Sequence, residues 1–96
     1  MDEIMGTAME VLQAKVSETG FDGSVKFDIE GHGVIRVEDG AVTDQDGDSD
    51  VTITASPDVL KELLDGELAP TAAFMSGKIK IDGDMGVAMK MSQLLG

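Results

Sequence analysis

The sequence has 96 residues, of which 42% are hydrophobic and 27% charged, and it contains no cysteine. This length predicts a single domain, residues 1–96, with one modest core. The 19 acidic and 7 basic residues give a net charge of −12. Such a charge argues against nucleic acid as a partner and against docking on anionic lipid through a basic patch. Without cysteine there are no disulfides, thiolate nucleophiles or cysteine zinc sites.

The two ends of the sequence and its apolar runs predict a cytoplasmic location. Met1, Asp2 and Glu3 open the chain with neither the basic segment nor the apolar run of a signal peptide. No apolar run approaches the ~18 residues that a membrane span needs, so no stable membrane insertion is expected. The last residues match no peroxisomal or retention signal.

The first predicted element is an amphipathic helix over residues 2–18. Apolar residues recur there at steps of three and four, which places them on one face of a helix. They are Ile4, Met5, Ala8, Met9, Leu12 and Val16. Gly20 is a typical stop signal for such a helix.

Four strands are predicted next, because the spacing of apolar residues changes from a helical period to two. The strands occupy residues 24–30, 35–38, 41–43 and 51–55, with turns at 31–33 and 39–40 and an acidic loop at 44–50. The alternation gives each strand one apolar and one polar face. Together with the short turns, it predicts an antiparallel meander with one buried face.

Three helices and one strand are predicted in the second half of the sequence. Ser56, Pro57 and Asp58 are typical of a helix start, since serine caps, proline fits the first position and an acid complements the helix dipole. The predicted helices lie at 56–66, 70–77 and from 84 to the end, and the strand lies at 78–82.

The last predicted helix, from Met85 to Leu95, is apolar around most of its circumference. Its polar side chains are only Lys90, Ser92 and Gln93. A helix of this kind must be buried on several sides. The sequence therefore predicts either a dimer formed through this helix or an apolar ligand against one side of it. The seven methionines would suit a ligand surface of variable shape, although they would equally fill a core.

No catalytic constellation is present, so we expect neither an enzyme nor a cofactor. His32 is the only histidine and lies between two glycines, which indicates a solvent-facing turn. The loop 44–50 holds four aspartates but has Ser49 where a calcium loop needs glycine, so it is interpreted as a solvated acidic turn. Gly77 and Lys78 lack the rest of a phosphate-binding loop.

A long ordered motif lies in the C-terminal third of the chain. The run Ala-Phe-Met-Ser-Gly-Lys-Ile-Lys-Ile-Asp-Gly-Asp spans residues 73–84 and precedes the Met-rich helix. It resembles the sterol carrier protein 2 domain family, and the resemblance extends over essentially the whole chain, most strongly after Val51. It implies an α+β fold with a mixed, mainly antiparallel five-stranded sheet and helices packed on one face.

The resemblance also implies an apolar tunnel between sheet and helices for a fatty acid, fatty acyl-CoA, sterol-like molecule or phospholipid. The lipid-binding positions carried over are Phe27, Ile29, Ile35, Val51, Ile53, Leu60, Leu64, Phe74, Met75, Met85, Met89 and Leu94. Phe74 and Met75 match the motif directly, whereas the strand positions rest on alternation. Lys78 and Lys80 match paired basic positions of the family; they either flank an edge strand, which we favour, or meet a lipid head group.

Three functions remain open at this stage. The first is a carrier of a lipid or fatty-acid-like ligand, which the resemblance favours. The second is a non-catalytic accessory module that presents a quinone-like lipid intermediate to a partner enzyme. The third is a structural dimer held by the Met-rich C-terminal helix. As a carrier, the protein is expected to be a monomer or a weak dimer.

Overall fold

A five-stranded sheet organises the structure, a computed structural model that describes residues 3–95. The strands are β1 (Ser24–Ile29), β2 (Gly33–Glu38), β3 (Ala41–Thr43), β4 (Val51–Ala55) and β5 (Ile79–Gly83). Their order across the sheet is β3-β2-β1-β4-β5. β1 and β4 run parallel and every other neighbouring pair runs antiparallel. The mixed, mainly antiparallel sheet is therefore confirmed.

The simple meander is wrong for β4, which does not pair with β3. It pairs instead with β1, along the edge of β1 that does not pair with β2, and Phe27 lies opposite Ile53. Two reciprocal bonds hold the start of β4 there. Ser24 Oγ accepts a hydrogen bond from the Asp50 amide at 2.8 Å, and Asp50 Oδ2 accepts one from the Ser24 amide at 3.0 Å.

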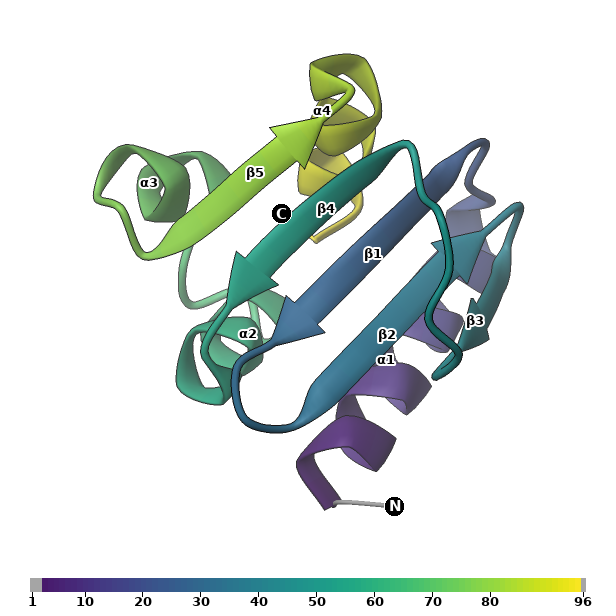
Figure 1. Cartoon of the computed structure of the whole chain (residues 1–96), viewed down its shortest axis with the longest axis horizontal. Helices are drawn as coiled ribbons and strands as arrows, with labels where there is room; N and C mark the ends of the chain where they lie inside the picture. The colour runs from purple at the N-terminus through teal and green to yellow at the C-terminus, as the bar shows by residue number, and fades with distance from the viewer. Residues whose placement is uncertain (1–2, 96) are drawn as a thin grey trace.

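The acidic loop 44–50 carries the chain across the polar face of the sheet to reach β4 (Figure 1). Lys26 Nζ on β1 lies 2.9 Å from Asp46 Oδ1. Arg36 Nε on β2 donates a hydrogen bond to the carbonyl oxygen of Asp48 at 3.1 Å. The hydrogen bond from Lys26 lowers the pKa of Asp46. Within residues 3–95, no three acidic or histidine side chains are grouped to hold a metal ion.

Helices cover one face of the sheet. They are α1 (Glu3–Thr19), α2 (Pro57–Leu64), α3 (Pro70–Met75) and α4 (Met85–Leu95). In Figure 1, α1, α2 and α4 lie behind the sheet, and α3 lies beside β5. The core forms between these layers, from the inward strand residues Val25, Phe27, Ile29, Ile35 and Val37 and the helix residues Leu12, Val16, Leu63 and Met91. The helices are thus packed on one face, as expected.

The last helix is less covered than its composition predicts. α4 buries Ala88, Met91 and Leu95, while Met85 and Met89 are exposed. The expectation of burial on several sides is therefore not met by the part of the chain that the structure describes. Among those residues, no helix combines the length and apolarity needed to cross a bilayer.

The start of α2 depends on a side-chain cap, which gives a first prediction. Ser56 Oγ accepts a hydrogen bond from the Val59 amide at 3.3 Å. Ser56→Ala should lower the free energy of unfolding by about 1 kcal/mol, because a helix-end amide loses its partner. Urea unfolding followed by circular dichroism measures this loss. Ser56→Asp keeps an acceptor and should restore most of the stability; an equal loss in both variants would contradict the capping role.

Candidate functional site

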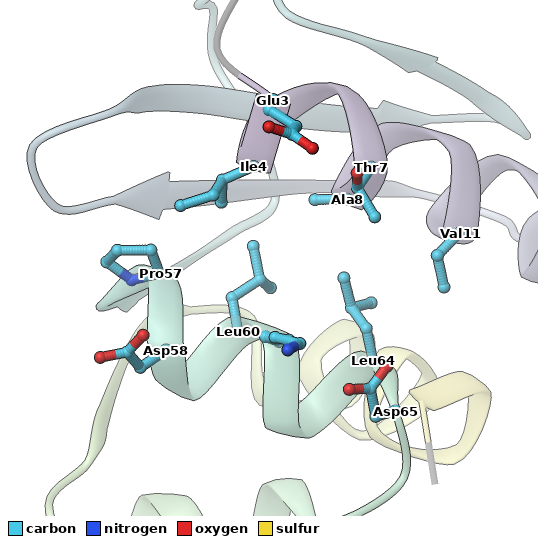
Figure 2. A pocket seen from close by; sticks show the side chains of 11 residues that line it. Glu3, Ile4, Thr7, Ala8, Val11, Pro57, Asp58, Leu60, Leu64 and Asp65 are labelled. Atoms are coloured by element: carbon cyan, nitrogen blue, oxygen red, sulfur yellow. The ribbon is translucent and has the colours of Figure 1, made fainter.

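A pocket with a volume of about 340 Å³ lies between α1 and α2. Figure 2 shows Ile4, Ala8 and Val11 of α1 facing Pro57, Leu60 and Leu64 of α2 across it. We call this the α1–α2 pocket, and its remaining lining residues are Glu3, Thr7, Asp58, Lys61 and Asp65. Its walls are therefore aliphatic, and polar side chains gather around them.

The spacing of apolar residues on α1 explains why the helix lines this pocket. Met5, Leu12 and Val16 form one stripe, buried in the core. Residues 4, 8 and 11 form an adjacent stripe at helical spacing, which faces α2 instead. Ala8 is buried but has only a methyl group, so the wall is set back at this position and space remains opposite Leu60.

The polar side chains of the pocket are mostly acidic. Glu3, Asp58 and Asp65 contribute carboxylates, and Lys61 contributes a single ammonium. Glu3 and Asp58 lie in the first turns of α1 and α2, where a negative charge complements the positive end of the helix dipole. All four side chains belong to exposed residues, so the charge lies at the mouth and the interior of the pocket is apolar.

The α1–α2 pocket has a size and walls that suit an apolar group. Ligand pockets typically have volumes of roughly 300–1,000 Å³, are lined by apolar side chains and carry a few polar groups that orient the ligand. This pocket lies at the small end of that range. Among the described residues that line it there is no histidine.

A second hollow, of about 490 Å³, lies between the end of α1 and α4. Its lining residues are Thr19, Gly20, Phe21, Asp22, Lys90, Gln93 and Leu94. Most of these are polar or glycine, and only Phe21 and Leu94 supply large apolar surface. This second hollow is therefore a poorer match for an apolar ligand than the α1–α2 pocket.

Comparison with known proteins places the chain in a family. The whole chain, residues 1–96, matches the model described as the SCP-2 sterol transfer family. The chain belongs to this family. Among curated relatives, bovine (Bos taurus) hydroxysteroid dehydrogenase-like protein 2 is 37% identical over 95 residues. That match covers 98% of this chain but only 21% of the bovine protein, so this family domain spans about a fifth of that relative.

Solved members of the SCP-2 family share the fold. The sterol carrier protein domain 2 of Helicoverpa armigera is similar with a TM-score of 0.81 and 29% identity, covering 96% of this chain and 85% of that one. Sterol carrier protein 2 of Aedes aegypti, solved in complex with the C16 fatty acid palmitate, has a TM-score of 0.82. It covers 100% of this chain and 97% of its own at 14% identity, so it shows the fold alone.

The twelve positions predicted for lipid binding are spread over the core, the two cavities and the surface. Seven are buried: Phe27, Ile29, Ile35, Val51, Ile53, Leu60 and Leu64. Of these, only Leu60 and Leu64 line the α1–α2 pocket, and Leu94 lines the second hollow. Four line neither cavity and are exposed: Phe74, Met75, Met85 and Met89. Lipid contact at these positions remains a prediction.

Sequence reasoning missed the contribution of α1 to the α1–α2 pocket. Ile4, Thr7, Ala8 and Val11 line the α1–α2 pocket, as does Pro57 at the start of α2. Ile4 and Ala8 had been recognised only as part of an apolar helix face. The width of that apolar face could have indicated this contribution, because a wide apolar face can pack against the sheet and a second helix at the same time.

The lysines near the motif lie at the edge of the sheet. β5 is an edge strand, and Lys80 is exposed on it, while Lys78 is exposed immediately before it. Charged side chains on an edge strand discourage pairing with another chain. The edge position agrees with the favoured role of these two lysines, and contact with a lipid head group remains a prediction.

Proposed function

We propose that the protein binds an apolar lipid in the α1–α2 pocket and carries it in solution. The observation that carries the proposal is the aliphatic pocket between α1 and α2, open at an exposed polar mouth. Membership of the SCP-2 sterol transfer family supports it, as does the palmitate complex of a protein with the same fold. The aliphatic walls of the pocket match the apolar chain of such a ligand.

A second function is favoured by the comparison with the longer bovine relative. There the matched region is only 21% of a protein named as dehydrogenase-like. A domain of this kind would present an apolar intermediate, for example one of quinone type, to a partner enzyme. Vesicle-to-vesicle transfer of a fluorescent lipid distinguishes the two functions: a carrier accelerates transfer by itself, whereas an accessory module binds the lipid and needs its partner.

Native mass spectrometry of the purified protein, followed by solvent extraction, tests the proposed function. A discrete adduct with the mass of a fatty acid, sterol-like molecule or quinone supports it and identifies the ligand. A ligand-free monomer that also fails to take up added lipid contradicts it. A ligand-free dimer would favour instead the structural dimer, with the exposed Met85 and Met89 of α4 as its interface.

Filling the mouth of the pocket gives a second prediction. Thr7→Trp should raise the dissociation constant of a fluorescent fatty-acid probe at least about tenfold, because the indole would occupy the space between α1 and α2. Fluorescence titration measures the change. Ala14→Trp is the matched control, since Ala14 is exposed on the same helix two turns later and does not line the pocket. Equal binding by both variants would exclude this pocket as the site.

A further inference from the structure

We infer that the mouth of the α1–α2 pocket favours apolar ligands whose head group is uncharged or cationic, and that it weakens the binding of ligands with a carboxylate or phosphate head. The inference deepens the proposed function and rests on it. A ligand chain in the pocket would lie along the aliphatic walls, and its head would remain at the mouth. Selectivity then depends on the charges placed there.

The charges at the mouth are unbalanced. Among the described residues that line the pocket, Glu3 on α1, Asp58 on α2 and Asp65 directly after α2 carry carboxylates, against the single ammonium of Lys61. Lys61 lies three residues after Asp58 and four before Asp65, positions that are neighbours on the surface of a helix. These two carboxylates therefore offset part of the charge of Lys61 and weaken its attraction for an anionic ligand.

The helix dipoles do not reverse this balance. The N-terminal ends of α1 and α2 both border the pocket, and each contributes about half a positive charge. Glu3 and Asp58 occupy the first turns of these helices and oppose that charge. The Val59 amide at the start of α2 already donates to Ser56 Oγ. The net charge of −12 on the chain adds a field that repels anions.

Hydrogen-bond chemistry at the mouth favours the same ligands. The carboxylates of Glu3, Asp58 and Asp65 can only accept hydrogen bonds when ionised. An alcohol, amide or ammonium head donates to them, whereas a carboxylate or phosphate head carries acceptors alone. For an anionic head, the side-chain donors among the described lining residues are Lys61 and the Thr7 hydroxyl.

The test compares three ligands with the same chain: dodecanol, dodecylammonium and laurate. Near neutral pH and at low salt, isothermal titration calorimetry should show that laurate binds about tenfold more weakly than dodecanol. Dodecylammonium should bind at least as tightly as dodecanol. The difference in affinity between laurate and dodecanol should shrink in about 1 M salt. The mouth is exposed, and at this salt concentration the Debye length falls to about 3 Å, so its charges are screened.

Charge variants assign the effect to the mouth. Glu3→Gln/Asp58→Asn/Asp65→Asn should bring laurate to the affinity of dodecanol. Lys61→Gln, a single change at an exposed residue, should weaken laurate more than it weakens dodecanol. The matched control is Asp28→Asn/Asp44→Asn/Asp82→Asn, which removes the same charge. Asp28 and Asp82 are exposed at outward positions of the strands, Asp44 is exposed in the loop, and none of the three lines the pocket.

The outcomes separate this inference from the proposed function. Equal affinity of laurate and dodecanol in the unmodified protein would overturn the charge selectivity and leave the binding site intact. Equal rescue of laurate by the control variant would also overturn it, because the effect would then come from overall charge. Failure of all three ligands to bind would overturn the proposed function itself.

Discussion

Replacing Phe27 with alanine is expected to lower the free energy of unfolding by about 3–5 kcal/mol. Phe27 is fully buried on the central strand β1, between Ile35 of β2 and Ile53 of β4. Its removal would leave a cavity in the core between the sheet and the helices. Since small domains are stable by only about 5–15 kcal/mol, this one change should shift the urea midpoint strongly or unfold the protein.

Phe74 provides the matched control for this experiment. It is also a phenylalanine and was also predicted to contact lipid, but it is 44% exposed. Phe74→Ala should therefore cost less than about 1 kcal/mol. If Phe27→Ala proved equally mild and weakened lipid binding, Phe27 would face a ligand cavity that opens between sheet and helices. A large loss of stability would instead identify Phe27 as a core residue.

The local elements of the fold could be predicted from sequence, but the placement of β4 could not. Alternation fixes which face of a strand is buried, as at Val51, Ile53 and Ala55. It carries no information about which neighbour the strand will join. The choice depends on tertiary contacts between residues far apart in sequence, such as the reciprocal bonds of Ser24 and Asp50. The mixed sheet was expected only from the family resemblance.

The candidate site was predictable only in part, for a similar reason. Leu60 and Leu64 were identified because α2 has a clear apolar face, and both line the α1–α2 pocket. Whether the apolar face of α2 packs tightly or leaves space depends on the size of the side chains opposite it on α1. One of these is Ala8, whose small side chain leaves space. Side-chain volume across an interface is a property of the pair of helices, which no single periodic pattern records.

Gly83, the last residue of β5, gives the last prediction. Its backbone has φ of +123°, a conformation that residues with a side chain rarely adopt. A Cβ atom here would lie 2.8 Å from Val51 Cα and would also clash with the carbonyl oxygen of Asp50. Both are backbone atoms at the start of β4, and unlike side-chain atoms they cannot rotate away. Gly83→Ala should therefore lower the free energy of unfolding by on the order of 3 kcal/mol.

The close approach at Gly83 also positions α4. The next amide, of Asp84, donates to the Asp50 carbonyl oxygen at 2.8 Å, and Asp84 Oδ1 accepts from the Gly86 amide at 2.8 Å. Displacing Gly83 would move this cap and the helix behind it. Gly77→Ala is the control, because Gly77 also has a positive φ, of +78°, but nothing lies within 4 Å of an added Cβ; it should cost only about 1 kcal/mol. Equal losses in urea unfolding would mean that backbone strain alone, and not contact with the start of β4, requires glycine at residue 83.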